Sequence, residues 1–176
     1  MIERAAVDSG DASTDTAAGR LRIPPDPAYI EALGRAFHHF TYLEWVVVST
    51  IAKLSNNGYG ALTKGRTAGY LAKKLLEAID SSSPALSSGL RQRLTRFHRS
   101  FVRAKHRRDR LVHARPYTAI QSLPRLGNGH HEWATEKLNL AATQFEEAAI
   151  EGEDIFHGDL TRELLRIGWD HSERSD

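Results

Sequence analysis

The stretch LRQRLTRFHRSFVRAKHRRDRLVHARP, residues 90–116, decides the fold of this 176-residue chain. Its apolar residues recur at the spacing of one buried face of an α-helix; they are Leu90, Leu94, Phe97, Phe101, Ala104 and Leu111. Pro116 cannot continue the helix, because it lacks a backbone N–H and disfavours helical backbone in the residue before it. The stretch therefore predicts a long helix, from about residue 84 to residue 114, that packs against other helices through one face.

Two further helices are predicted on the N-terminal side of this stretch. Asp26-Pro27 is a helix start, with Asp as the N-cap and Pro in the first turn, and Asn56-Asn57-Gly58 ends that helix. A loop is expected from there to about Gly65, followed by a shorter helix over residues 66–79. The inward face of the first helix is predicted to hold Ile30, Leu33, Phe37, Phe40, Val47, Ile51 and Leu54.

The C-terminal side begins with a different kind of segment. Gly127-Asn128-Gly129 is a turn signal within residues 117–134, which predicts a small hairpin. Thr135 is expected to cap a fourth helix, and Asp159 a short last helix that holds Leu160, Leu164 and Leu165. The predicted fold is therefore all-α: an antiparallel four- to five-helix bundle with a β-hairpin insert between helices 3 and 4.

Composition sets the boundaries of this domain and its surroundings. Residues 1–25 are small, polar and acidic and are expected to be disordered, residues 26–170 to form one domain, and residues 171–176 a flexible tail. The absence of cysteine excludes disulfides and cysteine metal sites. The N-terminus lacks an apolar run, and the longest apolar stretch, residues 45–48, is too short to cross a membrane. We therefore expect a soluble, cytoplasmic protein without a membrane partner.

Two charged residues interrupt the buried faces of the predicted helices. Arg108 falls at the centre of the apolar face of the third helix, and Glu44 lies in the face of the first, between Phe40 and Val47. A buried charge costs several kcal/mol unless it is paired or meets water. We therefore expect Glu44 and Arg108 to approach each other or to line one internal cleft, either as a structural ion pair or as part of a site between the helices.

His113 lies in the last turn of the third helix, just before the proline stop. A helix C-terminus favours the imidazolium form, and Asp109 lies four residues earlier, so this is a setting for a proton-transfer histidine as well as for an ordinary C-cap. Five residues separate Arg108 from His113, which is about 140° around a regular helix. The two side chains can therefore share one site only if Pro116 distorts the last turn or a second subunit supplies the partner.

Basic residues are concentrated in one segment of a chain whose net charge is only +2. Residues 91–115 hold ten Lys or Arg and a single acid, Asp109. Such a run is typical of a surface that binds nucleic acid, and the candidate RNA-binding residues are Arg103, Lys105, Arg107, Arg110 and Arg115. The alternative is a solvated helix face paired with acids of the fourth helix, namely Glu146, Glu147, Glu151, Glu153 and Asp154.

The residues Arg108-Asp109-Arg110-Leu111-Val112-His113 resemble the R-x4-6-H motif of the HEPN superfamily, in which a polar residue follows the arginine. The resemblance implies a helical-bundle domain that forms a homodimer, with the motifs of two subunits in one cleft. Many members are metal-independent endoribonucleases of toxin–antitoxin and phage-defence systems, and others are non-catalytic binding modules. Asp109 stands where Asn is commoner in the family.

Carried onto this chain, the resemblance implies a role for each motif residue. His113 acts as acid or base on the ribose 2′-hydroxyl or the leaving oxygen, and Arg108 holds the phosphate. Asp109 orients or tunes His113, and Glu44 positions or neutralises Arg108. The products are a 2′,3′-cyclic phosphate and a 5′-hydroxyl.

The expected partners are RNA, a second copy of the chain and an antitoxin or other protein. No cofactor or metal is expected, because the sequence holds no HExxH or similar spacing among its nine histidines. The alternative is a non-catalytic HEPN-like interaction module. A DNA-binding helical protein is disfavoured, because no helix-turn-helix spacing accompanies the basic segment.

Overall fold

The computed structural model describes residues 26–55, 59–63, 67–82, 85–118, 124–128 and 131–168. The chain is mostly helical, with a small three-stranded antiparallel sheet. In chain order the elements are α1 (Pro27–Ser55), α2 (Tyr59–Thr63), α3 (Ala68–Ser82), α4 (Ser88–Val112), β1 (Arg115–Thr118), β2 (Pro124–Gly127), β3 (Glu132–Trp133), α5 (Thr135–Glu153), the π-helical segment η2 (Asp154–Leu160) and α6 (Thr161–Arg166). The predictions for residues 1–25 and 171–176 lie outside the described residues.

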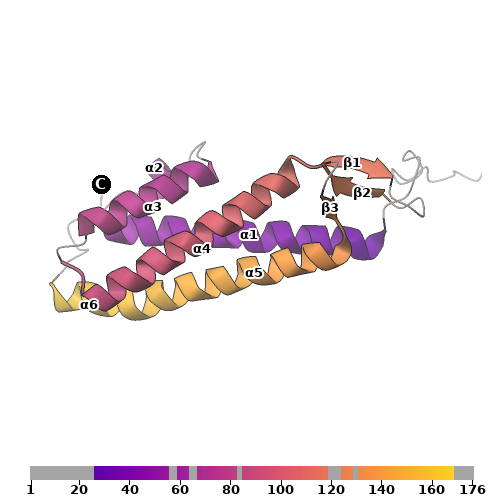
Figure 1. Ribbon diagram of the computed structural model, residues 1–176. Coiled ribbons are helices and arrows are strands. Elements are labelled where there is room, and N and C mark those ends of the chain that lie inside the picture. The colour runs from indigo at the N-terminus through magenta and orange to yellow at the C-terminus, as the bar shows by residue number, and fades with distance from the viewer. Residues whose placement is uncertain are drawn as a thin grey trace, which may run out of the picture.

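The long helices α1 and α5 lie side by side and run in the same direction (Figure 1). His39 of α1 contacts the carbonyl oxygen of Ala142, with 3.1 Å between Nδ1 and O, and Lys53, further along α1, hydrogen-bonds to Thr161 beyond the end of α5. Residues later in α1 therefore contact residues later in the C-terminal helical run, as in parallel helices. The predicted antiparallel arrangement is wrong for this pair.

By contrast, α4 runs antiparallel to its neighbours (Figure 1). Arg96 pairs with Glu151 at 2.8 Å, whereas Arg93, one turn earlier in α4, pairs with Asp159, which is later in the chain.

The short helix α2 explains why α1 and α5 run in the same direction. The ring of Tyr59 stacks on Trp45 at 5.5 Å, so the chain returns beside α1 through a short helix, where the sequence predicted a loop.

Four phenylalanines fill the core where α1, α4 and α5 meet. Phe40 stacks on Phe101 at 6.3 Å and meets Phe145 edge-on at 5.3 Å, and Phe97 is also fully buried. These are favourable geometries for ring pairs. The predicted inward face of α1 is wrong at its N-terminal half, where Ile30 and Phe37 are exposed. Small side chains are buried there instead, namely Ala32 and Ala36 of α1 and Ala141 and Ala142 of α5.

The predicted hairpin is present and is extended by a third strand. The order is β1-β2-β3, with Arg115 opposite Gly127 and Leu126 opposite Trp133. Trp133 is buried, and the backbone N–H of Leu126 donates to the hydroxyl of Tyr29 at 3.0 Å. The sheet is therefore anchored at the N-terminal end of α1 and the C-terminal end of α4 (Figure 1).

The chain after β3 forms one continuous helical run rather than two capped helices. Thr135 is the first residue of α5, and no side chain caps the helix from Ala134. Asp159 lies inside η2, which joins α5 to α6, so its predicted role as an N-cap is wrong. Of the three leucines named for the last helix, Leu160 and Leu164 are buried and Leu165 is 73% exposed. Among the described residues, no helix is both long and apolar enough to span a membrane.

Candidate nucleic-acid interface

One exposed face of α4 carries a row of arginines, Arg99, Arg103, Arg107 and Arg110, which we call the α4 cationic face. Their spacing places all four within about 80° around the helix axis. None of them forms an ion pair within 4.0 Å with a described residue. The predicted pairing with acids of the fourth helix occurs in the first half of α4, where Arg96 pairs with Glu151. The second half of α4 remains positively charged.

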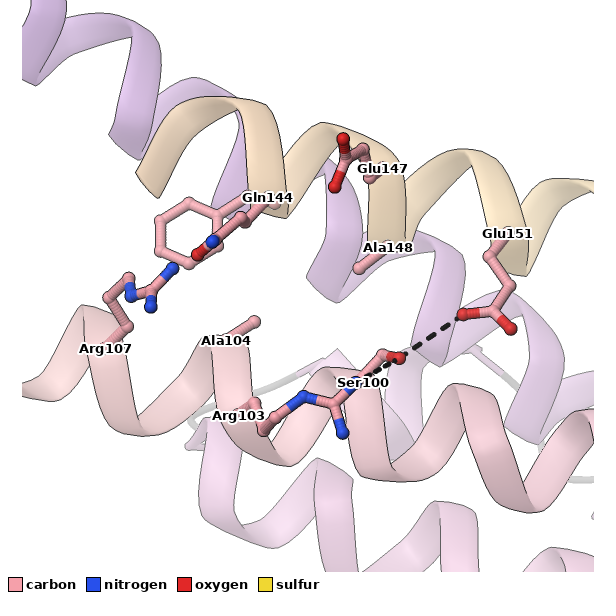
Figure 2. A pocket seen from close by; sticks show the side chains of 9 residues that line it. Ser100, Arg103, Ala104, Arg107, Gln144, Glu147, Ala148 and Glu151 are labelled. Atoms are coloured by element: carbon pink, nitrogen blue, oxygen red, sulfur yellow. Dashed lines mark hydrogen bonds between the residues drawn. The ribbon is translucent and has the colours of Figure 1, made fainter. Parts of the chain in front are cut away.

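A groove of about 380 Å³ runs between this face and α5 (Figure 2). Arg107 points across it toward Gln144, whereas Arg103 lies along α4 and donates to the hydroxyl oxygen of Ser100 at 3.0 Å. Burial lowers the pKa of Arg107, and the charge of Arg110 lowers it further. Mutual repulsion among these arginines favours an anion as their counterpart.

Arg108 faces the opposite way, toward α1, as its helical phase predicts. Its guanidinium lies over the ring of Phe40, 5.1 Å from the centroid, and Nη1 donates to Asp109 at 3.0 Å. The side chain is 30% exposed. A planar guanidinium satisfies both contacts at once, stacking on the ring while it donates to the carboxylate. Both of these contacts of Arg108 are made within one protomer.

Asp109 is engaged by two cations rather than by His113. Lys105 donates to its second carboxylate oxygen at 2.8 Å. Burial alone would raise the pKa of Asp109, but the hydrogen bonds and charges of Lys105 and Arg108 hold it below its usual value. Asp109 meets His113 through the backbone, where the His113 N–H donates to the Asp109 carbonyl oxygen at 3.0 Å. Among the described residues, no contact joins the Asp109 carboxylate to the His113 side chain, so the predicted orientation of His113 by this carboxylate is absent.

Glu44 lies on α1 beside this cluster and is half-buried. Among the residues that the structure describes, it forms no ion pair within 4.0 Å, and Arg108 pairs with Asp109 instead. Glu44 is nevertheless near enough to Arg108 for the two charges to interact, in line with the expected approach of the two residues. Burial raises the pKa of Glu44, the charge of Arg108 lowers it, and the charge of Asp109 raises it again. Glu44 and Arg108 are therefore coupled by charge without a direct contact.

His113 ends α4 as its C-cap and is exposed. It opens onto a hollow of about 1020 Å³ between the helix end and the sheet, which we call the sheet hollow. The hollow is lined by His113, Arg115, Pro116, Tyr117, Gly127, Asn128, His131 and Glu132. No hydrogen bond or ion pair joins His113 to Arg108 in the described part of the chain, so the two motif residues belong to different surroundings within one protomer.

The predicted site residues thus fall into three places. Arg103 and Arg107 line the groove with α5. A cluster between α4 and α1 is formed by Lys105, Arg108, Asp109 and Glu44. Arg115 and His113 line the sheet hollow, and Arg110 lies close enough to it to lower the pKa of His131. Among the described residues, no group of three or more histidine or carboxylate side chains is placed to hold a metal ion.

His131 is a site residue that no motif or spacing in the sequence marks. It precedes β3, and its ring meets the buried Trp133 edge-on at 5.2 Å. Burial lowers the pKa of His131, and the charges of Lys137 and Arg110 lower it further. Only the pairing of the strands brings it to the end of α4, and that pairing is not readable from the spacing of residues.

No protein-family model matches the chain, and no match to it was found among curated proteins or among solved structures.

Proposed function

We propose that this chain is a cytoplasmic, RNA-binding protein of the HEPN-like helical-bundle type that cleaves RNA without a metal ion, in a defence or toxin–antitoxin setting. The observation that carries the proposal is the α4 cationic face, whose arginines lack ion pairs with described residues and lead toward the hollow that His113 lines. A row of arginines without close ion pairs is a surface for a phosphate backbone.

Single-stranded RNA fits this surface better than a duplex does. The sheet hollow presents aromatic rings, Tyr117 and His131, beside the cationic residues, and unpaired bases stack on such rings while duplex bases cannot. The α4 cationic face then holds the phosphate backbone of the RNA beside the bound base. DNA lacks the 2′-hydroxyl that the proposed cleavage uses as its nucleophile.

The working form in this proposal is a homodimer. Within a protomer Arg108 faces α1 and His113 faces the sheet hollow, so a centre that uses both requires a second copy to bring its Arg108 to His113. An antitoxin or another protein would act by covering the cationic face or the hollow.

The experiment that tests the proposal measures binding and cleavage of fluorescent single-stranded RNA in EDTA. Arg103→Gln with Arg107→Gln should weaken binding and reduce the slope of log K against log salt by about 0.7 for each arginine–phosphate pair removed. His113→Ala should retain binding and lose cleavage by about a hundredfold or more.

The matched control removes two positive charges elsewhere. Arg35 and Arg166 are exposed and pair with acids on their own helices, so Arg35→Gln with Arg166→Gln changes the net charge equally without touching α4. If both double variants lose affinity to the same extent, the α4 cationic face is not the RNA-binding surface.

One observation favours a second candidate, a non-catalytic HEPN-like interaction module. Arg108 is already satisfied by Asp109 and Phe40, as expected of an arginine that supports the architecture rather than a reaction. RNA binding that persists in wild-type protein with no cleavage in EDTA or in magnesium would select this candidate.

A further inference from the structure

The pairing of the strands places two histidines at the same end of the sheet. Gly127 of β2 lies opposite Arg115 of β1 on one side and opposite Glu132 of β3 on the other. His113 comes two residues before Arg115, and His131 comes immediately before Glu132. Both histidines therefore come shortly before a residue that pairs with Gly127, and both line the sheet hollow.

The position of His131 is fixed by its surroundings. The N–H of Asn128 donates to the His131 carbonyl oxygen at 3.1 Å, and the ring packs edge-on against the buried Trp133. A Cβ at Gly127 would lie 2.7 Å from the ring of Tyr117 and 3.0 Å from the His131 carbonyl oxygen, so this close approach requires glycine. The hollow is thus a built feature of the sheet.

Cationic groups surround His131. Lys137 and Arg110 act on it electrostatically, Arg115 lines the same hollow, and Glu132, the acid adjacent to it in the chain, is hydrogen-bonded to Tyr117. Burial, Lys137 and Arg110 together lower the pKa of His131, which favours the neutral imidazole that can accept a proton. The same cations attract a phosphate to the hollow.

We propose that His113 and His131 of one protomer form the acid–base pair for cleavage of single-stranded RNA whose scissile phosphate sits in the sheet hollow. This rests on the proposed RNA-cleaving function and adds to it a second histidine, outside the R-x4-6-H motif and within the same chain.

The proposed step balances without a cofactor. His131 takes the proton of the ribose 2′-hydroxyl as the 2′-oxygen forms a bond to phosphorus. The bond between phosphorus and the 5′-oxygen breaks, and the imidazolium form of His113 gives its proton to that oxygen. The products are a 2′,3′-cyclic phosphate and a 5′-hydroxyl, and nothing is oxidised or reduced. Arg115 and Arg110 are the cations available to the phosphate oxygens.

The test compares cleavage and binding of one RNA oligonucleotide by wild type, His131→Ala and His131→Gln in EDTA. Loss of one acid–base group should slow cleavage about 100-fold to 10,000-fold, whereas affinity for a 2′-deoxy version of the oligonucleotide should change less than threefold. Added imidazole should restore part of the activity of His131→Ala, which a merely structural histidine would not allow. His131→Gln retains a polar side chain of similar reach and guards against misfolding of the sheet.

His157→Ala is the matched control, since this exposed histidine lies in η2 at the opposite end of the molecule from the sheet (Figure 1). Cleavage by wild type that is unchanged in both His131 variants would overturn the two-histidine pair and leave the proposed function standing. Binding without any cleavage by wild type would overturn both the pair and the nuclease. Absence of RNA binding would overturn the proposed function as a whole.

Discussion

Glu44 and Asp109 are two carboxylates near the same arginine, yet their pKa values shift in opposite directions. Asp109 accepts hydrogen bonds from Lys105 and Arg108, which outweigh the effect of its burial and lower its pKa. Glu44 accepts neither, so burial prevails and raises its pKa. At neutral pH one charge therefore stabilises the fold and the other opposes it.

This difference predicts opposite effects of neutralising the two residues. A raised pKa in the folded state means that stability falls as pH rises from the unfolded pKa through the folded one, so Glu44→Gln should make the protein more stable at pH 7 and not at pH 4. A lowered pKa has the reverse effect on stability. Asp109→Asn should therefore lower the free energy of unfolding by about 1 kcal/mol at pH 7, the upper range for exposed ion pairs. The loss should become smaller as pH falls. Urea unfolding of the three proteins at pH 4 and pH 7 measures both.

Each variant serves as the control for the other, because both remove one negative charge beside Arg108. Equal changes in the free energy of unfolding, with the same sign at pH 7, would mean that only the overall charge of the cluster matters and that the individual contacts do not.

The sequence predicts some of this site and not the rest. The inward direction of Arg108 follows from helical phase alone. Its partner does not, because adjacent residues diverge by about 100° on a helix and only a long side chain folded over Phe40 reaches Asp109. His131 is also beyond prediction, since the register of short strands depends on the turn and on packing.

At the scale of elements, the long helices were predictable and the joins between them were not. The apolar spacing of α1, α3, α4 and α5 gives their existence and approximate ends. Asp159 reads as a helix start, but Arg93 from α4 takes its carboxylate and the helix continues through it as η2. Such a contact between distant residues outweighs a local capping preference.

Gly152 is the position where α5 packs most tightly. A Cβ there would lie 2.5 Å from the ring of Phe97 and 2.7 Å from Cγ1 of Val46, so one residue limits the separation of α5 from both α4 and α1. Alanine normally stabilises a helix interior by about 1 kcal/mol relative to glycine. Here we expect Gly152→Ala to lower the free energy of unfolding by about 1–3 kcal/mol instead, because added volume in a packed core forces its neighbours to move.

Chemical denaturation of Gly152→Ala beside Gly89→Ala checks this prediction. A Cβ at Gly89 of α4 would meet nothing within 4 Å, so that substitution should leave stability unchanged or increase it. An increase at Gly152 equal to that at Gly89 would show that the helices can separate at no cost.

At the scale of the whole molecule, one end gathers the features of the proposed site. The sheet, the end of α4 and the start of α1 lie together, since Tyr29 of α1 accepts the N–H of Leu126 of β2 (Figure 1). Ile30 and Phe37 are exposed on α1 near this end, 47% and 38% respectively, and their spacing of seven residues puts them on one face. Exposed apolar side chains on one face are typical of a surface that another copy of the chain covers.

We therefore predict a homodimer that depends on Ile30 and Phe37. Light scattering should give twice the 19.7 kDa mass of one chain for wild type, and the mass of a single chain for the double variant Ile30→Glu with Phe37→Glu. The reason is that charges buried in an apolar interface would have no partners. Leu165→Glu, at a more exposed leucine on α6, should remain dimeric. Circular dichroism should show the helical content unchanged in all three. A monomeric wild type that still cleaves RNA would contradict the need for a second copy and leave His113 and His131 of one chain as the sufficient centre.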